Sequence, residues 1–539
     1  MQLVLAMNYM VDIAWLLSAC PDLVAAQQLV LCTGDARAQA NAAYLQALGL
    51  GPERCLCHSP PLPLSWGTHH TKALIIQYEE GLRVVVSTAN FIHCDCTAKT
   101  QGIWHQDFPW KDAASPSSSD FEASLTDYLA AMQLPLPWRY RVAKVVAQAD
   151  MSSARAFLVP SVPGRHSGAA LAKFGHMRLR ALLRQEPWLP PTVAPAAPVH
   201  SPSLASTASR PSTPEAAGRS SGGVVLQCSS QGRLTPAWLL QEFGGSLTAC
   251  APPGSLPLAQ HDTTQPQSQS QPQFQPQSQP APQQQAAPSL AGGPGIRQES
   301  GLGAWRQPPL PSSQAAQNKV GAGGQQAARA VPLPLCLSQL HLVWPTVQVR
   351  PLYSRLDLQA LGRQRSMPHI KTYCRFEQGG RLAWVLLTSH NMSKPAWGEL
   401  VQGGSQLLVR SYELGVLTTP TSLGRYFAHR HCGFSCAPGS APPAPQLPAT
   451  KDVTVELWGW QAWRRRQATD PKDLELTASR NSTVVHVFAP LPFGFPPTRY
   501  ATDADRAWAA DEVHSGVDAM GLTEDDYRGR SAYGHVETA

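Results

Sequence analysis

The sequence has no CxxC pair, although its 539 residues include 12 cysteines. The cysteines are scattered along the chain. Where Cys and His lie close together, as in Cys55-Leu56-Cys57-His58, their spacing is not that of a zinc site. Neither a disulfide framework nor a structural zinc motif is therefore predicted. The pattern favours reduced thiols in an intracellular compartment.

The sequence also lacks a long apolar run. No uncharged stretch reaches the ~18 residues that a membrane-spanning helix needs. The first 20 residues are apolar, but they have no basic start and Asp12 interrupts them. They are therefore not expected to be a signal peptide. We expect no membrane among the partners of this protein.

Proline, in contrast, is abundant, with 50 residues that cluster in a few places. Three stretches, 190–223, 251–330 and 437–449, are rich in Pro with Gln, Ser or Ala. Such segments cannot bury enough apolar surface to fold, so we predict that they are disordered insertions. The formal net charge of +7 suits a polyanionic partner without requiring one.

The first 50 residues alternate between strand-like and helix-like patterns. Leu3–Tyr9 and Leu29–Cys32 are apolar runs typical of buried strands, whereas Ile13–Leu17 and Ala36–Leu48 favour helices. This alternation predicts an α/β domain with helices layered on a sheet.

Two distant segments share one pattern of polar residues. The first has His70, Lys72 and Asn90, and the second has His369, Lys371 and Asn391. The His-to-Asn gap is 20 residues in the first (90 − 70) and 22 in the second (391 − 369). Each reads as a β-hairpin, with strands at His70–Tyr78 and Leu82–Thr88 in the first. The repeat indicates an internal duplication of one half-site.

Two such half-sites fit phosphoryl transfer without a metal or another cofactor. One neutral imidazole can attack phosphorus to form a phosphohistidine, while the other protonates the leaving oxygen and then activates water. Two lysines and two asparagines can donate to the non-bridging oxygens of the transition state. A single His or Lys is more often structural or solvated. The matched pair of sets favours catalysis.

Longer stretches around these motifs resemble the phospholipase D superfamily and, within it, the tyrosyl-DNA phosphodiesterase family. The matching stretches are Trp66–Lys72, Tyr78–Val85, Lys99–Trp104, Ser366–Tyr373 and Arg410–Leu417. The general superfamily signature has Asp five residues after the Lys, where this chain has Gln77 and Phe376. The tyrosyl-DNA phosphodiesterase branch lacks those aspartates as well.

The resemblance implies a fold of two similar phospholipase D-like α/β domains. Each would have a mixed sheet flanked by helices, and a pseudo-twofold axis would relate them. We expect the domains at 1–153 and 154–539, with the active site between them. The N-terminal extension and first core stretch of the family have no counterpart in this sequence.

The resemblance also implies roles for individual residues. His70 would be the nucleophile and His369 the general acid/base. Glu413 would orient His70, and Gln101 would orient His369. Trp66 would stack on a base of single-stranded DNA, and Ser229 and Ser230 would contact DNA phosphates.

The expected partner is DNA, single- or double-stranded, whose 3′ phosphate carries a tyrosine from trapped topoisomerase I or another adduct. A nuclear location and a monomeric state follow from the same resemblance. Two alternatives stay open. One is another phosphodiesterase or nuclease of the superfamily, which the missing aspartates disfavour. The other is a non-catalytic DNA-binding homologue, which the two complete His-Lys-Asn sets disfavour.

Overall fold

The structure is a computed structural model that describes most of the chain outside the Pro-rich stretches. The described residues are 1–34, 37–97, 99–112, 117–186, 223–249, 340–343, 367–377, 380–429, 434–436, 453–459, 483–493 and 495. The insertions expected at 251–330 and 437–449 lie outside them, and so does 190–222. Gly223, placed in an insertion by its sequence, instead begins a buried strand.

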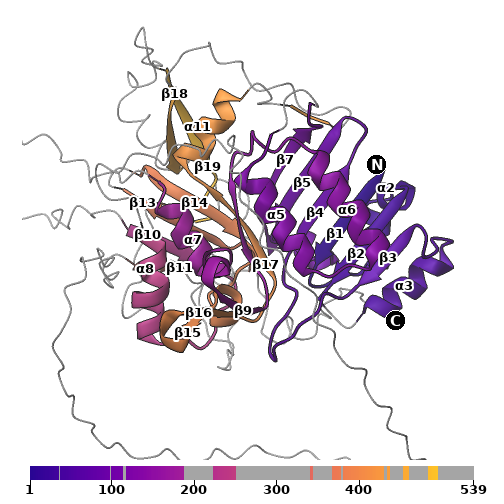
Figure 1. Cartoon of the computed structure of the whole chain (residues 1–539), viewed down its shortest axis with the longest axis horizontal. Coiled ribbons are helices and arrows are strands. Elements are labelled where there is room, and N and C mark those ends of the chain that lie inside the picture. The colour runs from indigo at the N-terminus through magenta and orange to yellow at the C-terminus, as the bar shows by residue number, and fades with distance from the viewer. Residues whose placement is uncertain are drawn as a thin grey trace, which may run out of the picture. The chain divides into compact units, whose positions relative to one another are not determined.

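The first half of the chain forms a six-stranded mixed sheet (Figure 1). Its strands are β1 (Leu3–Asn8), β2 (Gln28–Thr33), β3 (Cys55–His58), β4 (Ala73–Gln77), β5 (Gly81–Ser87) and β7 (Ile103–Pro109), in the order β3-β2-β1-β4-β5-β7. The strands β3, β2 and β1 run parallel, and β1, β4, β5 and β7 pair antiparallel.

The second half repeats this topology. Its six strands are β8 (Phe157–Ser161), β10 (Gly223–Gln227), β11 (Leu340–Val343), β13 (Thr372–Phe376), β14 (Leu382–Thr388) and β17 (Glu413–Thr418), in the order β11-β10-β13-β14-β17-β8. Here one parallel pair, β11 with β10, precedes the antiparallel pairs, whereas the first sheet has two parallel pairs. The order β2-β1-β4-β5-β7 thus matches β11-β10-β13-β14-β17, as an internal duplication predicts.

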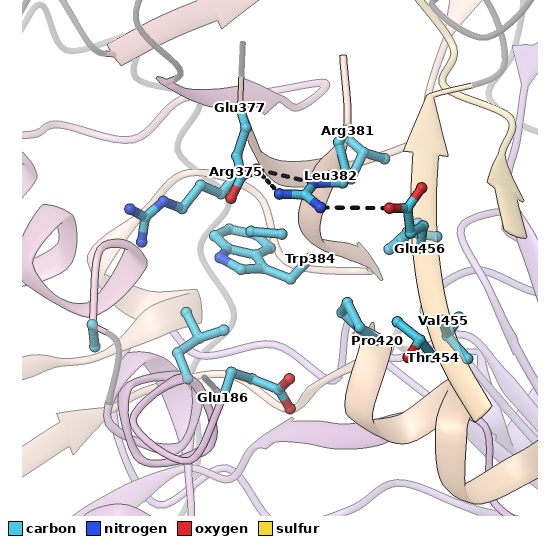
Figure 2. Close-up of a pocket in the computed structure, with 14 residues that line it drawn as sticks. Glu186, Arg375, Glu377, Arg381, Leu382, Trp384, Pro420, Thr454, Val455 and Glu456 are labelled. Atoms are coloured by element: carbon cyan, nitrogen blue, oxygen red, sulfur yellow. Dashed lines mark hydrogen bonds and ion pairs between the residues drawn. The ribbon is translucent and has the colours of Figure 1, made fainter. Parts of the chain in front are cut away.

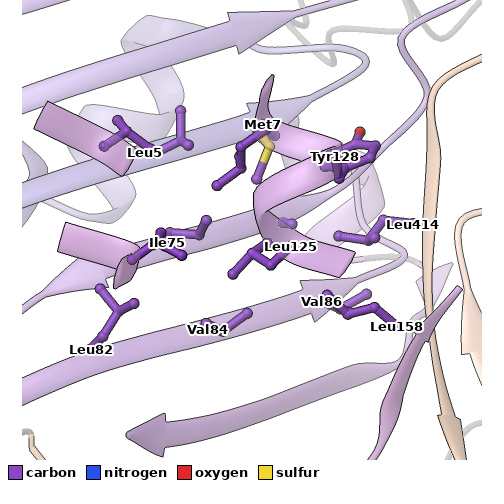
Figure 3. Close-up of a cluster of buried hydrophobic side chains, with 14 of the residues drawn as sticks. Leu5, Met7, Ile75, Leu82, Val84, Val86, Leu125, Tyr128, Leu158 and Leu414 are labelled. Atoms are coloured by element: carbon purple, nitrogen blue, oxygen red, sulfur yellow. The ribbon is translucent and has the colours of Figure 1, made fainter. Parts of the chain in front are cut away.

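Helices cover both faces of the first sheet (Figure 1). One face carries α5 (Asp120–Ala131) and α6 (Leu136–Gln148), and the other packs against α1 (Ile13–Ala19), α2 (Asp22–Ala25) and α3 (Ala38–Ala47). The hydroxyl of Ser119 accepts the Glu122 N–H at 3.1 Å, which caps the start of α5. Figure 3 shows Leu125 and Tyr128 of α5 in one cluster with the inward side chains of β1, β4 and β5.

The second sheet is covered in a similar way. One face packs against α7 (Gly175–Leu183), the π-helical turn η2 (Ala237–Phe243) and α10 (Lys394–Trp397), and the other against α11 (Pro420–Ala428) and the paired strands β18 (Val453–Gly459) and β19 (Thr483–Ala489). The remaining described elements are short: α4 (His93–Thr97), β6 (Lys99–Thr100), η1 (Gly168–Ala172), β9 (Gly164–Ser167), α8 (Gly244–Leu247), β12 (Met367–Pro368), β15 (Glu399–Val401), η5 (Gln402–Gly404) and β16 (Gln406–Val409). None of the helices in the described ranges is both long enough and apolar enough to cross a bilayer.

The two halves share one hydrophobic core. Leu158, Leu414 and Val416 of the second half lie in the same buried cluster as Leu125 and Val84 of the first. Figure 3 shows Leu414 and Leu158 at the edge of that cluster. The first sheet uses strands from residues 3–109 and the second uses strands from residues 157–418, and the division of the chain into domains at 153/154 stays a prediction.

The halves also meet backbone to backbone. A Cβ atom added to Gly67 would lie 2.0 Å from the carbonyl oxygen of Arg410. No rotamer change relieves a clash with a main-chain atom, so only glycine allows this approach. By contrast, a Cβ atom on Gly424, inside α11, would meet nothing within 4 Å.

We expect Gly67→Ala to lower the free energy of unfolding by about 1–3 kcal/mol, the usual cost of forcing an extra methyl group into a packed site. Its matched control, Gly424→Ala, should raise that free energy by about 0.5–1 kcal/mol, because alanine favours a helix interior over glycine. Urea titrations followed by circular dichroism would measure both. Equal unfolding midpoints for the two variants would contradict the contact at Gly67.

Candidate active site

The segment that carries His70 is held by the second half of the chain. The His70 N–H donates to the Tyr412 carbonyl at 2.9 Å, and the Tyr412 N–H donates to the Thr68 carbonyl at 2.8 Å. This pairing places His70 beside the next residue, Glu413, which begins β17. The Nδ1 atom of His70 lies 2.9 Å from Oε2 of Glu413.

His369 is held by the first half in the same manner. Its N–H donates to the Thr100 carbonyl at 3.0 Å, where β12 pairs in parallel with β6. The residue after Thr100 is Gln101, and its Oε1 lies 3.2 Å from Nδ1 of His369. Each histidine therefore meets a side chain from the opposite half.

This cross-pairing changes where the strands begin. The sequence pattern predicts strands that start at His70 and His369, but β4 starts at Ala73 and β13 at Thr372. Before these strands, the N–H groups of His70, His369 and Ile370 donate to carbonyls of the other half. Only the last residue before each strand, Lys72 or Lys371, accepts a backbone hydrogen bond within its own half. The prediction was wrong at these ends because tertiary pairing replaces the hairpin ladder there.

The contacts define which ring nitrogen carries the proton. The Glu413 carboxylate only accepts, so Nδ1 of His70 donates to it. The Thr88 hydroxyl donates to Oε1 of Gln101 at 2.7 Å, and Nε2 of Gln101 donates to the Asp95 carbonyl at 3.0 Å. This network orients the amide so that Oε1 accepts from Nδ1 of His369.

In both neutral rings, Nε2 therefore keeps a lone pair. The side chain of His70 is 15% exposed and that of His369 is 17% exposed, so part of each ring is accessible. Burial lowers the pKa of His70, and Lys72 lowers it further against the opposing charge of Glu413. Burial, followed by Lys371 and Lys99, lowers the pKa of His369 well below its usual value. Both imidazoles are thus neutral near pH 7.

The two lysines occupy equivalent buried positions. The Lys72 ammonium donates to the His70 carbonyl at 2.8 Å, and the Lys371 ammonium donates to the His369 carbonyl at 2.6 Å. Burial lowers the pKa of Lys72 to about 8, and burial together with Lys72 lowers the pKa of Lys371 well below its usual value. An anion placed between them would restore both charges.

The two asparagines are held by different contacts. Oδ1 of Asn391 accepts from the Ser229 hydroxyl at 3.1 Å and from the Ser230 N–H at 3.2 Å, which leaves its amide N–H groups as donors. The Asn90 N–H donates to Oδ2 of Asp95 at 2.9 Å. Oδ1 of Asn90 is buried and has no hydrogen-bond partner among the described residues.

Trp66 stands out from the surface beside this site. Its side chain is 89% exposed, and its backbone φ of 66° lies in the left-handed region that bulky residues rarely adopt. The flanking residues fix it, because Arg410 Nη1 donates to the Ser65 carbonyl at 3.1 Å and Gly67 abuts the Arg410 carbonyl. The backbone strain and the exposure of the indole are compatible with the predicted stacking role, which stays a prediction.

Several residues near the histidines were not identified from the sequence. The Tyr9 ring lies 5.4 Å from the His70 ring and 5.5 Å from the Lys72 ammonium. The Ser389 hydroxyl donates to Oε2 of Glu413 at 2.5 Å. Asp95 lies 3.6 Å from Nδ1 of His369. The duplicated spacing gave no sign of Asp95, because the second half has Ala396 at the equivalent distance from its asparagine.

A cavity elsewhere in the second half has a volume of about 130 Å³ (Figure 2). Trp384, Pro420 and Thr454 line it, and Arg381 pairs with Glu377 and Glu456 at its rim. None of the predicted site residues lines this cavity. Nor do three or more His, Cys, Asp or Glu side chains in the described part of the chain gather as metal ligands would.

Comparisons with known proteins agree on one family. The family model described as tyrosyl-DNA phosphodiesterase matches residues 1–283 and 302–501. Tyrosyl-DNA phosphodiesterase 1 of Arabidopsis thaliana is 32% identical over 525 residues, which cover 95% of this chain and 70% of that protein. Tyrosyl-DNA phosphodiesterase 1 of Drosophila melanogaster is 26% identical over 438 residues, covering 77% of this chain and 60% of the relative.

A probable tyrosyl-DNA phosphodiesterase of Caenorhabditis elegans is 27% identical over 371 residues, or 67% of this chain and 64% of the nematode protein. This chain thus spans less than two thirds of the nematode and fly relatives. Among solved structures, the crystal structure of the yeast tyrosyl-DNA phosphodiesterase aligns with 95% of this chain and 93% of its own. The TM-score is 0.49 and the sequence identity is 14%.

We expect anion binding at this site to weaken as the pH rises through about 8, because the bound anion requires the charged form of Lys72. Sulfate is a suitable probe, since its own charge is constant in this range. Calorimetry between pH 7 and 9.5 should show falling affinity, by roughly tenfold per pH unit above the pKa.

The variant Lys72→Met should abolish the fall in sulfate affinity near pH 8. Lys173→Met serves as its control, because Lys173 pairs with Asp127 on the surface. An affinity for sulfate that stays constant across this pH range in the unmodified chain would contradict the assignment of Lys72 as an anion ligand.

Proposed function

We propose that this chain, which belongs to the tyrosyl-DNA phosphodiesterase family, hydrolyses the bond between a DNA 3′ phosphate and a tyrosine. The tyrosine would derive from trapped topoisomerase I, and other 3′ adducts would react in the same way. The observation that carries the proposal is the pair of histidines with Nδ1 held from the opposite half and, among the described residues, no hydrogen bond to Nε2.

The first chemical step forms a bond from Nε2 of His70 to phosphorus. The bond from phosphorus to the tyrosine oxygen breaks, and that oxygen takes the proton from Nε2 of a protonated His369. The products of this step are free tyrosine and DNA attached to His70 through a phosphohistidine. His70 suits this role because burial keeps its imidazole unprotonated near pH 7.

The second step releases the DNA. His369, now neutral, takes a proton from water as the water oxygen attacks phosphorus, and the bond between phosphorus and His70 breaks. The DNA leaves with a 3′ phosphate, and His369 is protonated for the next cycle. Its pKa is low in the free protein because it is buried among cations, so the negative phosphodiester promotes its protonation on binding.

Lys72, Lys371 and the amide of Asn391 would bind the non-bridging oxygens, where negative charge lies throughout both steps. Asn90, the counterpart of Asn391 in the first half, would bind these oxygens as well. Ser229 and Ser230 hold Asn391 in place. Because Ser230 is also exposed, we propose that this turn contacts the phosphate backbone as well. A nuclear location and a monomeric state, both expected from the substrate and the family, complete the proposal.

We expect purified protein to release tyrosine from a 3′-phosphotyrosyl oligonucleotide in the presence of EDTA. His70→Ala should abolish release, because no nucleophile remains. His369→Ala should slow the second step and leave DNA attached to protein, visible as a band that migrates slowly in denaturing gels.

The double variant His70→Ala/His369→Ala is the control for that band and should show none. Absence of tyrosine release by the unmodified chain would contradict the proposed activity. An adduct that persists in the double variant would contradict His70 as the nucleophile.

We expect Trp66→Ala to weaken binding of single-stranded DNA by about 1–3 kcal/mol, the typical contribution of one base stacked on an aromatic ring. Tyr140→Ala is a matched control, since Tyr140 is an exposed aromatic residue of α6 with no predicted DNA contact. Fluorescence anisotropy with a labelled oligonucleotide measures both. Equal affinities for the two variants would contradict stacking on Trp66.

A further inference from the structure

We infer that Asp95 is a positioning residue for His369, and that it sets the protonation of this general acid/base together with its neighbour Lys99. The inference rests on the proposed function, because it assigns a further residue to the same reaction. It starts from a carboxylate that is fully buried beside the site and that the steps above do not use.

Asp95 contacts three residues of the site at once. Its Oδ2 accepts the Asn90 N–H at 2.9 Å and lies 3.6 Å from Nδ1 of His369. Its main-chain carbonyl accepts from Nε2 of Gln101 at 3.0 Å. The same residue therefore fixes an asparagine, the amide that orients His369, and the electrostatic surroundings of His369 itself.

The fold does not require a carboxylate at this position. Asp95 is the third residue of α4 and follows Asn90 by five residues. The duplicated position is Ala396, the third residue of α10, which follows Asn391 by five residues and is also buried. Burying a carboxylate costs free energy that alanine avoids, so a structural role alone does not explain Asp95.

The two histidines differ in the charge of the side chain that each one contacts through Nδ1. His70 contacts the charged Glu413 directly, whereas His369 contacts Gln101, which is neutral. Asp95 provides the missing negative charge from a more distant position. Lys99 reduces that charge, because its ammonium lies 2.5 Å from Oδ1 of Asp95.

The other charged groups around His369 are cationic. Lys371 comes from its own segment, Lys99 from β6 and Lys72 from the first motif, and each lowers the pKa of His369. The imidazole of His70, neutral near pH 7, also faces it and would lower that pKa if protonated. Within the described part of the chain, Asp95 is the one carboxylate within 4 Å of a ring nitrogen of His369. Its removal would leave His369 among cations, and the protonated form would become less favourable.

The test is the pH dependence of kcat/KM for tyrosine release from a 3′-phosphotyrosyl oligonucleotide. Asp95→Asn should move the limb that reports His369 to lower pH by roughly one unit. Lys99→Met should move the same limb to higher pH, because Asp95 is then unopposed. The double variant should lie between the single variants, and kcat should change more than KM.

Thr97→Ala, on the exposed side of the same helix, is the matched control and should leave the profile unchanged. A uniform loss of rate at every pH in Asp95→Asn, with no displacement of either limb in Lys99→Met, would overturn the inference. If Asp95→Asn does not fold, Lys99→Met alone decides the question. Tyrosine release by the unmodified chain separates this outcome from failure of the proposed function, which would abolish release in every variant.

Discussion

The site depends on a one-residue offset in the hydrogen bonds that join the two halves. The His70 N–H binds the carbonyl of Tyr412, and the next residue, Glu413, then faces the His70 ring. The His369 N–H binds the carbonyl of Thr100, and Gln101 follows in the same way. Neither half therefore contains both members of either pair, and the close approach of Gly67 to the Arg410 carbonyl lies beside the first of these contacts.

This arrangement buries two histidines and two lysines close to one another. The pKa values of His70, Lys72, His369 and Lys371 are all lowered, with burial as the largest cause. Under the proposed function, a bound phosphodiester would relieve this unfavourable burial, since its charge would stabilise each protonated group. The halves remain unequal, because a carboxylate touches His70 directly while His369 meets a neutral amide with Asp95 behind it.

Much of this could be predicted from the sequence because the duplication repeats its spacing. The two His-Lys-Asn sets predict the hairpins β4–β5 and β13–β14, and both hairpins occur within the two matching strand orders. The predicted start of β4 at His70 was wrong, because backbone pairing between the two halves leaves no pattern in the neighbouring sequence. Asp95 was missed because its duplicated counterpart is alanine. The parallel pairing of β18 with β19 was missed because it joins segments some 30 residues apart, and the alternation of Val453, Val455 and Leu457 with polar residues in β18 does not say which strand is its partner.

The most direct test of the account is to identify the atom that carries the DNA during turnover. The unmodified chain would be mixed with a 3′-phosphotyrosyl oligonucleotide, and the reaction would be stopped within the first turnover by an alkaline denaturant. The protein would then be digested, and its peptides would be analysed by mass spectrometry. The account predicts a nucleotide on the peptide that contains His70, and none on the peptide that contains His369. Attachment at His369, or hydrolysis with no attached intermediate, would contradict it.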